Sequence, residues 1–172
     1  VFVHNDVGWM FSHAVVRAAV LDGADGFGRL AAHHVVCGEV LESRFRDTSE
    51  IGAERVAAHY LAAGLFSAAV GPLQTAAEAR RGRGDLGVAR GHLERLEQVL
   101  VGEGRAADEI YGWSLVRQAR IAAMQARLED AEALLARADA AVPVSAWNRA
   151  EGQCVLAIVG QMRGLPSEGT IA

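Results

Sequence analysis

The segment Arg127–Pro143, RLEDAEALLARADAAVP, decides the fold class. Its apolar residues recur every three or four positions, which places them on one face of a helix; they are Leu128, Ala131, Leu134, Leu135 and Ala138. Outside this stripe lie the charged residues Glu129, Asp130, Arg137 and Asp139. Pro143 ends the helix, because proline has no N–H to donate and disfavours helix at the preceding residue. The segment therefore predicts an amphipathic helix with one face against a partner.

The partner is the preceding segment, Leu115–Ala126, which is also apolar at helical spacing. Only a residue or two separates the two helices, so they must fold back as an antiparallel pair. Small residues at Ala119 and Ala122 face small residues at Ala131 and Ala138, which lets the two backbones approach closely. A close antiparallel pair of this kind resembles a tetratricopeptide repeat.

Similar stretches fill most of the chain, and glycines or prolines separate them. Besides the segment above, we expect helices over about 12–21, 29–44, 49–63, 67–81, 86–100, 106–126 and 145–163. The first residues, VFVHNDVGW, suit an edge strand or a tail, and we predict no strand pair. The expected fold class is all-α: about eight helices in antiparallel pairs, wound as a right-handed, tetratricopeptide-like α-solenoid superhelix.

Composition narrows the function classes. A length of 172 residues with 51% hydrophobic residues suits one globular domain with a real core. All 17 basic residues are arginine, which indicates a GC-rich, bacterial genome and excludes a Walker A lysine or a Schiff base within this chain. The net charge of −4 gives no general attraction for nucleic acid. Without a signal peptide or a membrane-length apolar run, we expect a cytoplasmic protein.

Chemistry-bearing residues form no recognisable metal or catalytic pattern. Cys37 and Cys154 lie far apart in the sequence and are predicted to be buried, reduced thiols. The candidate metal ligands are His13, His33, His34 and His59. Adjacent histidines on a helix point about 100° apart, so they do not share an ion easily. We predict no metal, no cofactor and no catalytic residues.

An arginine cluster could bind an acidic partner or phosphate; it comprises Arg80, Arg81, Arg83 and Arg90. We interpret it as a solvated helix end, where cations suit the negative end of the helix dipole.

The N-terminal part adds a second resemblance. The segment FSHAVVRAAVLDG carries Phe11, His13, Val16, Arg17 and Ala19. A helix ending in Leu41-Glu42 follows it, and then a helix with His59 and Tyr60 before Gly64. This order resembles the region after the ATPase core in large bacterial signal-transduction ATPases, including LuxR-type activators and kinase- or cyclase-linked modules. The family's Arg-rich segment with a Leu-His pair is represented here by Gly28-Arg29-Leu30 and His33-His34.

The second resemblance covers about three quarters of the chain and implies a role. It implies a non-catalytic repeat region that senses a ligand or partner and restrains an ATPase or effector. Residues 1–48 would be a helical segment linking to a preceding domain, and residues 49–172 the repeat region. The alternative is a stand-alone helical protein that binds a small apolar ligand between its helices.

The expected binding surface is the concave face, which the first helix of each pair lines in a repeat stack. The candidates are Glu54, Leu61, Trp113, Val116, Arg120, Ala123, Glu151, Cys154, Ile158 and Gln161. Trp113 and Arg120 lie two turns apart on one helix and so share a face. Tryptophan offers a large apolar contact and arginine clamps a carboxylate or a carbonyl. The open alternative is that neighbouring helices cover these apolar residues.

The predicted partner is a protein or peptide segment, with the ATPase or effector domain of the same polypeptide as one candidate. A small-molecule effector is a further candidate. We predict no direct nucleic-acid binding and no membrane contact.

Overall fold

The computed structural model describes residues 2–5, 8–45, 50–141 and 145–164. Its elements are β1 (Phe2–Asn5), β2 (Gly8–Phe11), α1 (Ala14–Gly26), α2 (Leu30–Phe45), α3 (Glu50–Ala62), α4 (Phe66–Gly82), α5 (Leu86–Gly102), α6 (Glu109–Met124), α7 (Leu128–Ala140) and α8 (Ala146–Met162). All eight predicted helices are present. The helix predicted over about 12–21 ends too early, because α1 continues through Gly23 to Gly26.

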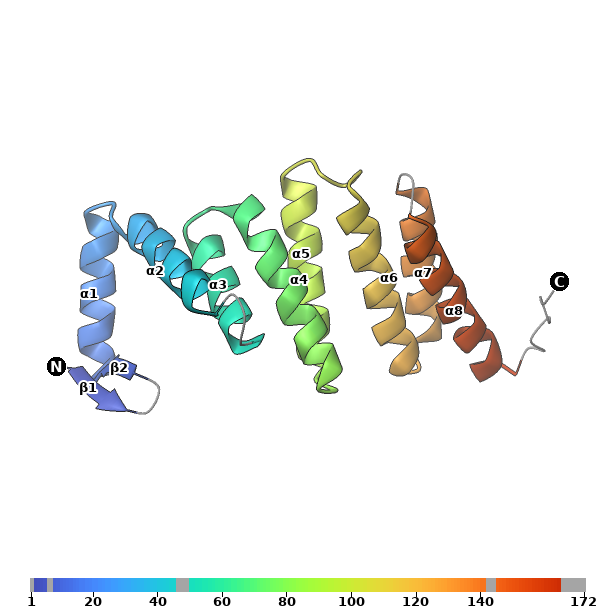
Figure 1. The fold of residues 1–172 in the computed structure, drawn as a ribbon, viewed down its shortest axis with the longest axis horizontal. Helices are drawn as coiled ribbons and strands as arrows, with labels where there is room; N and C mark the ends of the chain where they lie inside the picture. The colour runs from blue at the N-terminus through green and yellow to red at the C-terminus, as the bar shows by residue number, and fades with distance from the viewer. Residues whose placement is uncertain (1, 6–7, 46–49, 142–144, 165–172) are drawn as a thin grey trace.

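The first two elements form a hairpin at the N-terminal end of the molecule (Figure 1). Strands β1 and β2 pair antiparallel, with Phe2 opposite Phe11 and Asn5 opposite Gly8. The prediction that the chain has no strand pair is therefore wrong. Strands of four residues are too short for alternating hydrophobicity to distinguish them from a tail. Apart from this hairpin, the regular structure of the described residues is helical.

The helices follow one another along the long axis of the molecule, with the β1–β2 hairpin at one end and α8 at the other (Figure 1). They alternate between two layers, with α4, α6 and α8 in one and α3, α5 and α7 in the other. Helices α1 to α7 pack mainly against their neighbours in the chain, whereas α8 packs more extensively against α6 than against α7. Helix α1 contacts only α2 and β2 among the described elements.

The turns between helices share one hydrogen-bonding pattern. The glycine after α3, α4 and α5 has positive φ and ends the helix in the left-handed conformation, at Gly64, Gly84 and Gly104. The next residue donates its N–H to a carbonyl five residues back; the pairs are Leu65 to Tyr60, Asp85 to Arg80 and Arg105 to Leu100. The α6–α7 turn repeats the pattern with Ala126 at φ 57° and Arg127 donating to Ala122. An alanine thus occupies a position that favours glycine.

The core of the described residues lies between the layers, and its largest cluster is formed by α6, α7 and α8. The small residues predicted to face each other are all buried: Ala119, Ala122, Ala131 and Ala138. They share one cluster with Leu115, Leu135 and Val155. A second cluster contains Val56, Ala57 and Tyr60 of α3, against α4 and α5. The predicted close antiparallel pair of α6 and α7 is confirmed.

Both cysteines are exposed, so the prediction of buried thiols is wrong. In α2 the buried position is the next residue, Gly38, where an added Cβ would lie 2.6 Å from a ring carbon of Tyr60. In α8 the residue after Cys154 is likewise the buried one; it is Val155. Neighbouring residues on a helix are rotated by about 100°, so Cys37 and Cys154 fall outside these contacts. No helix among the described residues has the length and apolarity needed to cross a bilayer.

Candidate partner-binding face

One layer of the molecule carries a group of charged and aromatic side chains at helical spacing. Trp113, Arg117 and Arg120 lie on one face of α6, four and then three residues apart. Helix α4 contributes two more residues and α8 another two, again three or four apart. We call these seven residues the α4–α6–α8 face: Glu78, Arg81, Trp113, Arg117, Arg120, Trp147 and Glu151.

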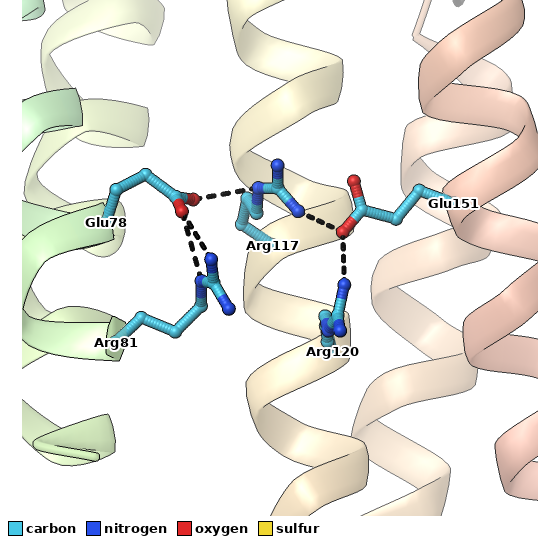
Figure 2. Close-up of polar contacts among 5 residues, drawn as sticks. All are labelled: Glu78, Arg81, Arg117, Arg120 and Glu151. Carbon is cyan, nitrogen blue, oxygen red and sulfur yellow. Dashed lines mark hydrogen bonds and ion pairs between the residues drawn. The ribbon is translucent and has the colours of Figure 1, made fainter. Parts of the chain in front are cut away.

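The charged members form one alternating chain across the three helices (Figure 2). Arg81 Nη2 donates to Glu78 Oε2 at 2.7 Å, and Arg117 Nε lies 2.8 Å from Glu78 Oε1. Arg117 Nη1 donates to Glu151 Oε1, which also accepts from Arg120 Nη1 at 2.9 Å. The order is therefore Arg81, Glu78, Arg117, Glu151, Arg120.

Burial divides this chain into a fixed centre and an accessible end. The side chains of Arg117 and Glu151 are only 10% and 7% exposed, whereas that of Arg120 is 41% exposed. A buried charge is costly unless a partner compensates it, so the central pair must stay together in the folded state. Glu151 Oε2 is buried without a hydrogen-bond partner. Arg120 remains available to a ligand.

Two tryptophans enclose the central guanidinium. The Arg117 guanidinium carbon lies 5.5 Å from the ring centroid of Trp113 and 5.0 Å from that of Trp147. These distances allow cation–π attraction, which strengthens as water is excluded. Trp113 is half-buried and packs against the clusters of α3, α4 and α5. Trp147 is 60% exposed, so a large aromatic surface faces solvent beside a fixed charge.

The exposed flank of α8 continues beyond the charged chain. Trp147, Glu151, Cys154 and Ile158 recur at spacings of four, three and four, so they share one side of the helix. Cys154 and Ile158 are exposed. On α6, Met124 follows Arg120 by one turn and is also exposed. An aliphatic surface therefore adjoins the aromatic and charged one.

The structure brings together part of the predicted binding surface. Trp113, Arg120 and Glu151 are members of the α4–α6–α8 face, while Ile158 and Gln161 lie exposed on the adjoining flank of α8. The placement of Val116 and Ala123 on an open surface is corrected, because both are buried in the cluster with α7 and α8. Their positions on α6 point to the neighbouring helices, as the open alternative allowed.

Glu54 and Leu61 belong to the other layer, on α3. Leu61 packs against the core cluster of α3, α4 and α5. Glu54 accepts hydrogen bonds from Arg80 Nε and Nη2, and His92 Nε2 lies 3.2 Å from its Oε1. These contacts, above all the Arg80 hydrogen bonds, lower the pKa of Glu54 to about 2. Glu54 is thus held by side chains of α4 and α5 and is not a member of the α4–α6–α8 face.

Four members of the face were not predicted as site residues: Glu78, Arg81, Arg117 and Trp147. The spacing of Trp113, Arg117 and Arg120 carried the signal, since residues four and three apart on a helix lie on one side. The pairing with Glu78 and Glu151 is carried by other helices and needs the fold. In the predicted arginine cluster, Arg80 pairs with Glu54 and Asp85, Arg81 with Glu78, and Arg90 with Glu94.

Two of the four histidines considered as metal ligands meet. His34 Nδ1 on α2 lies 2.8 Å from His59 Nδ1 on α3. Desolvation, followed by the charges of His34 and Arg55, lowers the pKa of His59. Within the described parts of the chain, no three His, Cys, Asp or Glu residues are placed to hold a metal ion.

Comparisons of this chain with protein-family models, with curated proteins and with solved structures give no match.

Proposed function

We propose that this chain is a non-catalytic helical-repeat module that binds a protein or peptide segment on the α4–α6–α8 face. In this proposal its helix pairs form a tetratricopeptide-like, right-handed superhelix within a larger bacterial signalling or transcription-regulatory ATPase. The observation that carries the proposal is the exposed Trp147, stacked on Arg117, whose ion pairs cross three successive helices of one layer. Arginine and tryptophan are the residue types enriched in binding hot spots.

Rigidity supports a binding role. Arg117 is restrained by two carboxylates and two indole rings, so little side-chain entropy remains to be lost when a partner docks. The adjoining apolar flank of α8 suits the apolar side of an extended or helical segment. The binding partner in this proposal is the ATPase or effector part of the same polypeptide. Nucleotide chemistry would belong to that part, because this chain has no lysine to bind phosphates as a Walker A lysine does.

The binding role is tested with a displayed library of random peptides selected against the whole chain. We expect peptides whose affinity, measured by calorimetry, falls by about 2 kcal/mol in Arg120→Ala and in Trp147→Ala. Neither change should alter the helical circular dichroism, because both side chains are substantially exposed. The matched control is Arg149→Ala, two residues from Trp147 and so on another side of α8. Failure to select any binder, or equal binding by all variants, would contradict the proposal.

The link to an ATPase has its own test. We expect an ATPase core encoded in the same reading frame or directly beside it, and no ATP binding by the isolated chain in equilibrium dialysis. Measurable ATP affinity of this chain alone would contradict the assigned division of roles, whatever the peptide experiment shows.

A further inference from the structure

The charges on the α4–α6–α8 face do not balance. Three guanidinium groups, of Arg81, Arg117 and Arg120, share the two carboxylates of Glu78 and Glu151. The face therefore carries one net positive charge on a chain whose formal net charge is −4. The surplus lies at the ends of the alternating chain, because Arg117 in the middle contacts both carboxylates and each end arginine contacts one.

Arg120 is the end residue of the ion-pair chain that has N–H donors to spare. It also lies beside an apolar surface. Among the described residues, Arg120 contacts Glu151 through Nη1 alone, although a guanidinium has five N–H donors in a planar fork. The side chain is 41% exposed, so the remaining donors can reach a ligand. A planar fork of this kind binds a carboxylate through two parallel hydrogen bonds.

Exposed apolar side chains lie on α6 and α8 beside the ion pair of Arg120 with Glu151. Trp147 is 60% exposed, and Ile158 lies three turns along the same flank of α8. Exposed Met124 follows Arg120 by one turn on α6. A ligand that pairs with Arg120 can therefore also cover a large aromatic or aliphatic surface.

We infer that the α4–α6–α8 face binds an acidic amphipathic peptide segment, with a side-chain carboxylate on Arg120 and an apolar side chain against Trp147. This inference rests on the proposed function and names the chemistry of its partner. The positive end of the ion-pair chain selects the acidic group, and the tryptophan supplies apolar contact.

The test compares three synthetic peptides of equal length and identical apolar residues, with Glu, Gln or Lys at every polar position. Each is titrated against the whole chain at low and at high salt. We expect the Glu peptide to bind at least about tenfold more tightly than the Gln peptide, and the advantage to shrink at high salt, because exposed charges are screened. Arg120→Gln should abolish the advantage, whereas Arg149→Gln should leave it unchanged.

The exposed cysteines give a second readout of where the peptide lies. A bound Glu peptide should slow native labelling of Cys154, which lies on the flank of α8 between Trp147 and Ile158. Cys37 on α2 serves as the internal control, and its labelling rate should not change.

The outcomes separate the inference from the proposed function. Equal binding of the Glu, Gln and Lys peptides, with loss in Trp147→Ala, would overturn the acidic specificity and leave a peptide-binding face. An undiminished advantage in Arg120→Gln, or protection of Cys37 in place of Cys154, would also overturn it. Failure of these peptides and of every library peptide to bind would overturn both proposals.

Discussion

Helices α1 and α7 have the same length but differ in how much of their surface is buried. Each has 13 residues, and each contains eight residues of type Ala, Val or Leu. Helix α7 buries Ala131, Leu135 and Ala138, whereas α1 buries none of its residues. Val15 of α1 is 79% exposed. Apolar content alone therefore does not place a helix in the core.

The difference lies in how the large side chains are distributed round each helix. At 100° per residue, the three leucines of α7 fall within an arc of about 120°. The four large apolar residues of α1, Val15, Val16, Val20 and Leu21, spread over about 240°. One neighbouring helix cannot cover so wide a surface, and α1 contacts only α2 and β2 among the described elements. Helix α7 instead contacts both α6 and α8.

The largest predicted effect tests this contrast directly. Leu135→Ala should lower the free energy of unfolding by about 2–5 kcal/mol, because it leaves a cavity in the core of α6, α7 and α8. Val15→Ala in α1 should change it by less than about 0.5 kcal/mol. Urea denaturation followed by circular dichroism measures both. Equal losses in the two variants would mean that α1 is packed as firmly as α7.

Overpacking should sharpen the same contrast. Ala131→Leu should cost about 1–3 kcal/mol, since Ala131 is fully buried where α6 and α7 approach. The matched control, Ala133→Leu, adds the same atoms at an exposed position two residues away. Thermal unfolding should show a lower Tm for the first variant only. An unchanged Tm in Ala131→Leu would show that the two helices do not pack at this point.

Acidification should weaken the contact between α2 and α3, where His34 meets His59. The folded state lowers the pKa of His59 below its ordinary 6.5, so the unfolded chain binds the proton more readily. Burial, the main cause of this shift, makes a charged His59 costly in the folded state, so the stability that neutral His59 allows is full above pH 6.5 and is lost as the pH falls toward the lowered pKa. Hydrogen exchange at α2 and α3 should quicken on acidification before that of α6 and α7. His59→Gln should remove this pH dependence; its persistence would assign it to another group.

The smallest effect concerns the turn into α7. Ala126→Gly should raise stability by about 0.5 kcal/mol, because alanine is strained at positive φ and glycine is not. The control, Ala133→Gly, should lower stability by about 1 kcal/mol, since it puts glycine inside a helix. Differential scanning calorimetry of the two variants should show Tm shifts of opposite sign. A lower Tm in Ala126→Gly would mean that the turn tolerates alanine without strain.

Helix spacing and helix ends could be predicted from sequence, because they depend on local chemistry. Periodicity indicated the close contact of α6 with α7, and the glycines between the apolar stretches indicated where helices are separated. Local patterns could not show which helices pack against each other. Cys154 was predicted to be buried because cysteine usually is, but its neighbour Val155 takes the buried position in α8.

The candidate site was predictable only within a single helix. Trp113 and Arg120 lie on one helix, and their shared face followed from their spacing. The contacts of Arg117 with Glu78 and Glu151 join residues 39 and 34 positions apart in sequence, on helices α4, α6 and α8. No periodicity relates such distant residues. Glu54 was grouped with α6 and α8 because its helix, α3, was predicted to line the same face as they do. In the structure α3 lies in the other layer, with α5 and α7.

The pattern of contacts also sets how the chain folds. Contacts between described elements join neighbours or next neighbours in sequence, and the ion pairs of α4, α6 and α8 follow the same rule. Few residues must be looped out before any two elements meet, so the entropy of chain closure is low. Such local topologies fold in microseconds to milliseconds. The connections α3–α4, α4–α5 and α6–α7 each have three residues, so each of these helix hairpins closes at low entropic cost, whereas α1, which buries none of its residues, gains least from its neighbours.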